Sequence, residues 1–128
     1  MQAFLTLNPK IMNAILKLGR YLFAIPIAIF GVFHFMNADA MSGMVPLPGG
    51  VVWVYLTGVA LILAAVSIII RKHDRLASFL LGIMLLIFAL SIHLPSVMDG
   101  NESSMPNLLK DIALAGGAFA YGMLAGDD

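Results

Sequence analysis

The 128-residue sequence contains no cysteine. This absence excludes a disulfide framework, a thiol redox couple and iron–sulfur clusters ligated by cysteine. Charged residues are also scarce, at 11% of the chain, where a soluble domain has about a quarter. The formal net charge is zero, so the charge balance gives no indication of a nucleic-acid partner.

Hydrophobic residues fill the place of the missing charges, since they make up 61% of the chain. So little polar surface cannot cover a soluble globule, and we expect an all-α integral membrane protein whose first partner is the lipid bilayer. A span needs about 20 apolar residues to cross the hydrocarbon layer. Four segments meet this length, and they predict a four-helix transmembrane domain over residues 20–126, with spans at about 20–37, 51–70, 75–94 and 107–125. The last is the weakest because Lys110 and Asp111 interrupt it.

The segment 1–19 predicts a short amphipathic helix before the first span. Asn8 and Pro9 suit an N-cap and a first helical residue, and apolar and polar side chains then fall on different faces. Such a helix lies on the inner membrane surface or extends the first span into the cytoplasm. The basic region, the apolar run and Ala38-Asp39-Ala40 also imitate a signal peptide. The long basic region and the Pro26 and His34 inside the apolar run favour a retained span instead.

Lysine and arginine predict the orientation of the chain. They precede the first span and fill the loop between the second and third spans, whereas loops 37–50 and 95–106 contain none. Positive loops stay on the cytoplasmic side. We therefore expect a multi-pass protein of the cell membrane, an inner membrane in bacterial terms, with both termini in the cytoplasm.

Polar side chains from several spans fall at one depth. At about 1.5 Å per residue, His34 lies about 21 Å above the inner surface, His93 about 27 Å and Tyr55 about 22 Å. Trp53 lies somewhat higher, and Lys110 and Asp111 lie at about 22–24 Å. Ionisable groups within a membrane usually face the interior of the bundle. The spacing thus predicts one outer pocket lined by His34, Trp53, Tyr55, His93, Lys110 and Asp111.

Each of these residues also has a purely structural explanation. Trp53 and Tyr55 suit an aromatic belt at the outer interface. Lys110 can extend towards water, and Asp111 suits the positive end of a helix dipole; because the two are adjacent, they cannot be assumed to pair. His34 and His93 can be hydrogen-bonded at a helix interface. A structural polar cluster and a functional pocket both remain open.

The order of several short motifs resembles the DoxX-like membrane proteins. The segments "GRYLFAIPIAIFGVFHF", "VPLPGGVVWVYLTGVALILAAVSIII", "RLASFLLGIMLLIFALSIHLP" and "LKDIALAGGAFAYG" carry the likeness over about residues 19–122. The resemblance implies a four-helix bundle. It also implies a loose link to redox biology, because the family is named after a subunit of a thiosulfate:quinone oxidoreductase. It marks His34, Trp53, Tyr55, His93, Lys110 and Asp111 as motif positions.

Four functions follow for such a pocket. It can bind a quinone within a membrane redox module, or His34 and His93 can be the axial ligands of a b-type haem. It can belong to a transport path, although the lower part of the bundle offers few polar groups. The chain can instead be a non-catalytic partner of a membrane redox complex, or a homo-oligomer. We expect a redox-associated accessory subunit, with catalytic activity left open and no metal besides that of a haem.

Overall fold

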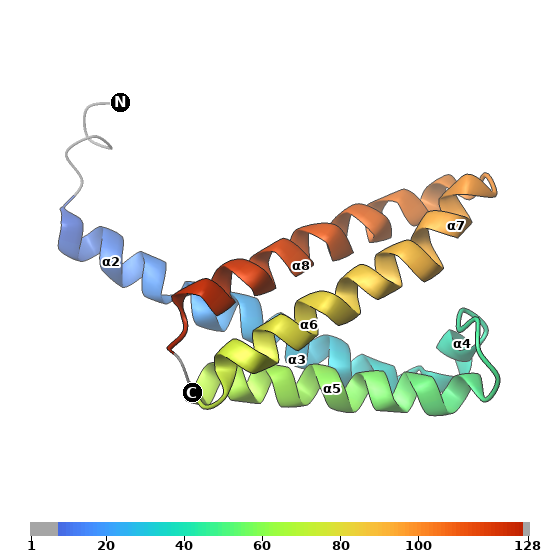
Figure 1. Ribbon diagram of the computed structural model, residues 1–128, viewed down its shortest axis with the longest axis horizontal. Coiled ribbons are helices and arrows are strands. Elements are labelled where there is room, and N and C mark those ends of the chain that lie inside the picture. Colours follow the sequence, from blue (N-terminus) through green and yellow to red (C-terminus); the bar gives the residue numbers. More distant parts are fainter. Residues whose placement is uncertain (1–7, 127–128) are drawn as a thin grey trace.

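A computed structural model describes residues 8–126 as a set of helices. Figure 1 shows α2 (Pro9–Lys17), α3 (Gly19–Met36), α4 (Ala38–Ser42), α5 (Gly50–Ile70), α6 (Asp74–Phe88), α7 (Leu94–Met98) and α8 (Met105–Leu124). A π-helical turn, η1 (Ala89–His93), joins α6 to α7, and a 3₁₀ turn, η2 (Glu102–Ser104), leads into α8. No strand is present within residues 8–126, so the all-α prediction is confirmed.

Three helical segments are long and apolar enough to cross a membrane. They are Pro9–Met36, Gly50–Ile70 and Asp74–Met98. The outward surface of the helices fits this reading, because large apolar side chains such as Leu22 and Leu63 are 72% and 61% exposed. An apolar surface of this extent is unusual in a soluble monomer. The α8 helix has a similar length but contains Lys110 and Asp111, and it does not belong to this apolar group.

The N-terminal helix α2 forms where the sequence predicts it. The side chain of Asn8 accepts a hydrogen bond from the backbone N–H of Lys10 at 2.9 Å, and Pro9 takes the first helical position. The helix ends at Leu18, whose N–H turns back to the carbonyl of Ile15, and α3 follows directly. No residue of α2 is buried, and Figure 1 shows it projecting away from the other helices. The first seven residues of the predicted segment 1–19 lie outside the described residues.

The long helices form two closely packed pairs, α3 with α5 and α6 with α8, and α5 joins the pairs through α6. Close packing within the first pair depends on Gly31 and Gly58, because a Cβ atom on Gly31 would lie 2.9 Å from the carbonyl oxygen of Gly58. In the second pair Gly82 accommodates the ring of Phe119. The buried core lies between the pairs: Ala24, Ile27, Leu61, Ala64, Ala65, Ile68, Leu81, Leu85, Ala115 and Ala118.

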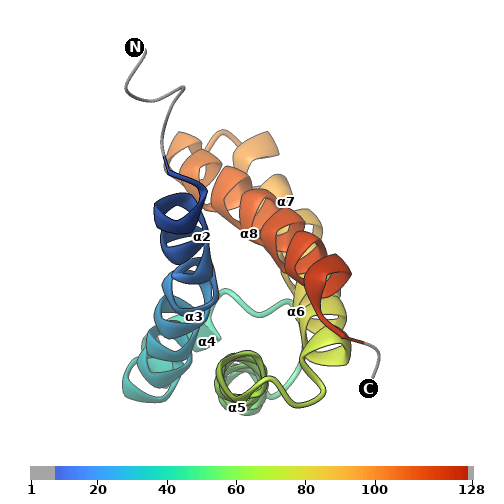
Figure 2. The same cartoon turned by 90° about the vertical axis from the view of Figure 1, so that its left-hand side faces the viewer.

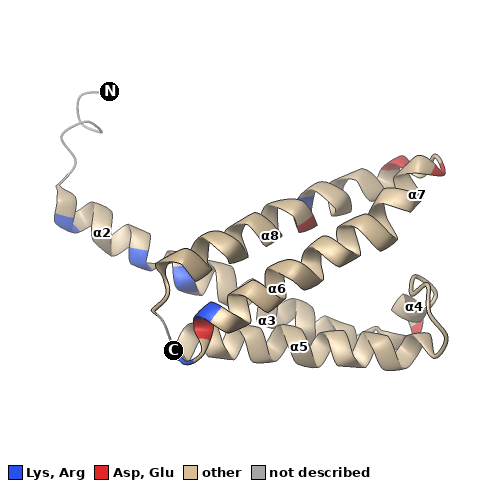
Figure 3. Ribbon diagram, viewed as in Figure 1, with Lys and Arg blue, Asp and Glu red and all other residues tan. Residues whose placement is uncertain are grey.

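The two pairs diverge towards the end that carries α4 and α7. Figure 1 shows the separation widening there, and Figure 2 shows α3, α5, α6 and α8 arranged around one axis. Figure 3 shows that Lys and Arg gather at the opposite end, near the start of α3 and the α5–α6 turn. Within the long helices away from the ends, the charged pair on α8 stands out in Figure 3. The wide end therefore contains charge where the helices leave space between them.

Candidate functional site

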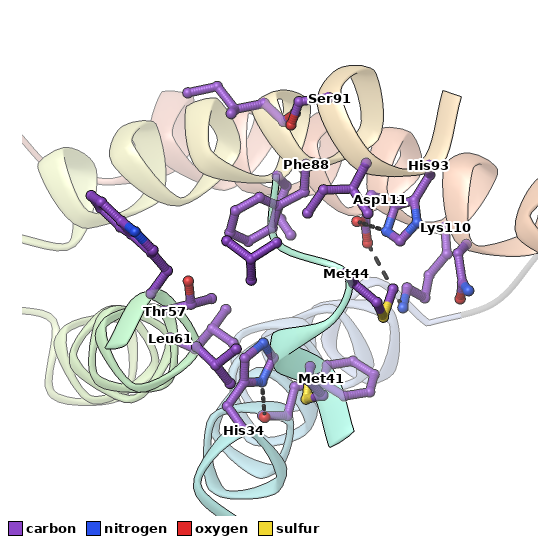
Figure 4. A pocket seen from close by; sticks show the side chains of 18 of the residues that line it. His34, Met41, Met44, Thr57, Leu61, Phe88, Ser91, His93, Lys110 and Asp111 are labelled. Carbon is purple, nitrogen blue, oxygen red and sulfur yellow. Dashed lines mark hydrogen bonds and ion pairs between the residues drawn. The ribbon is translucent and has the colours of Figure 1, made fainter. Parts of the chain in front are cut away.

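A cavity of about 450 Å³ lies at the wide end, between the two helix pairs. Its walls come from α3, α5, the α6–η1 segment and α8, and the loop after α4 covers its mouth (Figure 4). Most of the lining is apolar, including Phe30, Trp53 and Phe88. Small-molecule sites are usually cavities of about 300–1,000 Å³ with mainly apolar walls and a few polar groups. The cavity matches this description.

Its strongest polar feature is a carboxylate held between two nitrogens. Asp111 is buried, and its Oδ2 lies 3.1 Å from Nε2 of His93. Its Oδ1 lies 3.8 Å from Nζ of Lys110, whose side chain is 45% exposed. The lysine ammonium also lies 5.1 Å from the ring centroid of Phe30, within the range of a cation–π contact. Although Lys110 and Asp111 are neighbours on one helix, the long lysine side chain bends back, so the two do pair.

His34 contributes a second polar group from the other helix pair. Its Nδ1 lies 2.6 Å from the carbonyl oxygen of Phe30, one turn earlier on α3. A carbonyl oxygen only accepts, so Nδ1 donates; in a neutral imidazole, Nε2 is then an acceptor. Figure 4 shows the His34 ring directed into the cavity, with His93 and Lys110 on the far side. The cavity thus has an acceptor on one wall and a cationic donor on the opposite wall.

The two aromatic residues of α5 take different positions. Trp53 lines the cavity, and its Nε1 donates to the carbonyl of Pro48 at 2.9 Å, which ties the covering loop to the helix. Tyr55 does not line the cavity; its ring stacks on Phe35 with centroids 5.6 Å apart. Residues two apart on a helix point about 200° apart around the axis, so they cannot share one wall. Of the six predicted residues, the structure brings together His34, Trp53, His93, Lys110 and Asp111.

The π-helical turn η1 carries His93 to the cavity. Here the N–H of Leu94 bonds to the carbonyl of Ala89, five residues earlier. Pro95 follows and has no N–H to give, while the Ser91 hydroxyl donates to the carbonyl of Ile87 at 2.5 Å. Single π-turns inside α-helices are frequent at functional sites. The feature of the sequence that indicates this turn is Pro95, two residues after His93.

Sequence reasoning missed several lining residues. Thr57 adds a hydroxyl from α5, and Met41 and Met44 cover the mouth (Figure 4). Met41 belongs to α4, and Met44 belongs to the following loop, which also contains Val45, Pro46 and Leu47. A connection between spans is usually polar, so this apolar run is the available signal that the loop folds over a cavity.

The floor of the cavity is apolar. Ile27, Leu61 and Leu85 line it and belong to the buried core below. This floor provides no polar path towards the other end of the bundle.

The haem hypothesis fits the residues poorly. Nε2 of His93 is engaged with Asp111, so iron could be ligated through this nitrogen only if the pair separated. We derive no role for a haem.

No protein-family model, curated protein or solved structure matches this chain. A fold made of common helices does not identify an activity.

Proposed function

We propose that the chain is a DoxX-like membrane protein of four spans, with α8 as the fourth span and both termini in the cytoplasm. Three helices with the length and composition of spans support a multi-pass arrangement. The α8 helix has 20 residues, which suits a span of about 30 Å. Its buried Asp111 faces His93 rather than lipid. The Lys and Arg residues at the narrow end favour that end as the cytoplasmic one (Figure 3).

We propose further that the cavity binds a flat, apolar carbonyl compound of the quinone class, as part of a redox-associated accessory subunit. The observation that carries this proposal is the pairing of apolar aromatic walls with a donor and an acceptor on opposite sides. Phe30, Trp53 and Phe88 offer flat surfaces to a ring. Lys110 and His34 stand on different walls (Figure 4). A quinone carbonyl oxygen can accept a hydrogen bond from Lys110. In the reduced form, a quinol, the hydroxyl at the opposite edge of the ring can donate to Nε2 of His34.

The side chains have distinct roles in this proposal. The Lys110 ammonium donates a hydrogen bond to a carbonyl oxygen, and Asp111 holds the ammonium in place. His34 accepts from a ligand hydroxyl through Nε2, since its Nδ1 is engaged with Phe30. Nε2 of His93 contacts Oδ2 of the buried Asp111, and the other carboxylate oxygen, Oδ1, faces the ammonium of Lys110. A bound quinone would supply two-electron, two-proton redox chemistry.

A second candidate is a non-catalytic partner subunit of a membrane complex. One observation favours it: His34 and His93 both have partners within the chain. A polar cluster whose hydrogen bonds are made within the chain can have a purely structural role, in which it fixes how the helices pack. This candidate predicts co-purification with a larger enzyme and no saturable ligand binding.

Trp53 provides the test, because it is the chain's single tryptophan and lines the cavity. Purified protein in detergent would be titrated with a short-chain ubiquinone analogue while tryptophan fluorescence is recorded. We expect saturable quenching. Lys110→Met should weaken binding about tenfold or more, because a hydrogen bond from a charged group contributes about 1.5–3 kcal/mol.

Tyr55→Phe is the control, since it changes an aromatic residue that lies on α5, as Trp53 does, but outside the cavity. It should bind like the unmodified protein. Quenching that never saturates, or that is equal in the Lys110→Met and unmodified proteins, would overturn the quinone proposal.

A further inference from the structure

A second cleft of about 800 Å³ lies at the narrow end, opposite the first cavity. It is formed by the α2–α3 junction, the α5–α6 turn and the end of α8. Four cationic side chains line it, and the carboxylate that lines it is Asp74. The cations are Lys17, Arg20, Arg71 and Lys72. This excess of positive charge is what an anionic ligand requires.

The carboxylate of Asp74 is hydrogen-bonded within the protein, and one carboxylate cannot neutralise four cations. It is buried, and its Oδ2 accepts a hydrogen bond from the Tyr121 hydroxyl at 2.7 Å. Nε of Arg20 donates to the same hydroxyl at 3.3 Å, which fixes Arg20 at the cleft wall. Within residues 8–126, Arg71 and Lys72 form no ion pair with a carboxylate. As far as the described residues show, both side chains can therefore contact an anionic ligand in the cleft.

The α5–α6 turn contains two residues with an unusual backbone conformation. Arg71 has a φ of 62° and His73 a φ of 54°, positive values that are uncommon outside glycine, although Asn, Asp and His adopt them more often than other residues. The N–H of Lys72 bonds back to the carbonyl of Ser67 at 3.1 Å, which closes the end of α5. A tight turn of this kind keeps Arg71 and Lys72 at the rim of the cleft.

One side of the cleft is apolar and lies between α3 and α8. These helices make few backbone contacts with each other, and Phe23 fills the space beside Gly117, 3.2 Å from where its Cβ would be. Leu16 and Leu124, which also line the cleft, are 68% and 87% exposed. A free phosphate would leave this apolar side unused. A phosphate attached to acyl chains would use both sides.

We propose that this cleft binds the phosphate headgroup of an anionic phospholipid, with its acyl chains along the surface between α3 and α8. Basic pockets between transmembrane helices on the cytoplasmic side are known to bind such headgroups. The proposal depends on the membrane location of the chain and not on what the first cavity binds. Failure of the quinone experiment would leave it untouched.

Native mass spectrometry of the detergent-solubilised full chain tests it. The protein would be titrated with phosphatidylglycerol and, separately, with phosphatidylcholine of the same acyl chains. We expect one phosphatidylglycerol to bind at least about tenfold more tightly than phosphatidylcholine, and added salt to weaken it. The Arg71→Gln/Lys72→Gln variant should lose this preference.

Lys10→Gln is the control, because Lys10 is a cation of α2 that does not line the cleft. It should retain the preference, and far-ultraviolet circular dichroism would show that each variant is folded. If the double variant does not fold, the proposal is tested by the effect of added salt on phosphatidylglycerol binding to the unmodified protein. Equal binding of both lipids, an unchanged preference in the folded double variant, or no effect of salt would refute the proposal. So would inorganic phosphate competing as well as the lipid, since that would show a site for free phosphate.

Discussion

The pair formed by His93 and Asp111 allows a prediction with a definite sign and size. Their side chains are 12% and 7% exposed, and the two atoms that meet are 3.1 Å apart. His93→Leu would leave a buried carboxylate with Lys110 at 3.8 Å as its remaining partner. Leaving a buried charged group without its hydrogen-bond partner costs about 1–3 kcal/mol or more. Because Lys110 remains, we expect His93→Leu to lower the free energy of unfolding by about 2–3 kcal/mol.

The double replacement His93→Leu/Asp111→Leu should behave differently. It removes both polar groups together, so neither desolvation penalty remains, and similar exchanges are often neutral or stabilising. We expect its free energy of unfolding to lie within about 1 kcal/mol of the unmodified protein. The coupling energy between the two positions should then be about 2 kcal/mol or more.

Lys110→Met provides a comparison on the same carboxylate. The lysine side chain is 45% exposed and 3.8 Å away, so its pairing contributes about 0–1 kcal/mol to stability. Unfolding would be followed by circular dichroism as sodium dodecyl sulfate is added to mixed micelles. The reasoning would be refuted if the loss in His93→Leu/Asp111→Leu equalled the sum of the losses in the single variants His93→Leu and Asp111→Leu. It would also be refuted by a His93→Leu loss below about 0.5 kcal/mol.

Two further predictions concern packing and topology. Gly31→Ala should destabilise the α3–α5 pair by about 1–3 kcal/mol, because its Cβ would lie 2.9 Å from the backbone oxygen of Gly58. Gly116→Ala is the control, because its Cβ would meet nothing within 4 Å. It should be neutral or slightly stabilising in the same unfolding assay. The chain has no cysteine, so introduced cysteines report accessibility cleanly. In intact cells an impermeant thiol reagent should label Asp39→Cys and Asp99→Cys but not Lys72→Cys, and labelling at position 72 would reverse the proposed orientation.

The ends of α3 and α5 were predictable because they depend on local chemistry, whereas the third predicted span, 75–94, was too short, since the helical segment continues through Pro95 to Met98. The first predicted span, 20–37, corresponds to Gly19–Met36, and the second, 51–70, to Gly50–Ile70. Gly49 and Gly50 mark the start of α5, and the basic run from Arg71 marks its end. Asn8 and Pro9 began α2 as expected, since an N-cap acts within one turn.

The partners within the cavity were less predictable, because they depend on how helices are rotated against each other. Depth along a span placed His93 and Asp111 near one level, but not in contact. Tyr55 had the right depth and the wrong direction, since it stacks on Phe35. Pairing of Lys110 with Asp111 required the bend of a long side chain, which residue spacing does not describe. The position of the loop after α4 over the cavity could not be predicted from hydrophobic periodicity, because a loop has no regular repeat.

The π-helical turn also has a consequence for the phase of the third span. In an uninterrupted α-helix each residue advances about 100°, so the twelve steps from Leu81 to His93 would leave the histidine about 120° away from the leucine's face. The wide turn at Ala89–His93 absorbs about one extra residue, which reduces the offset to about 20°. Leu81, Leu85, Ala89 and His93 therefore form one stripe. A helical wheel drawn for a regular α-helix places the histidine on the wrong side. Deleting one residue within this turn would restore a regular helix of eleven steps from Leu81, which keeps the histidine about 20° from the leucine's face.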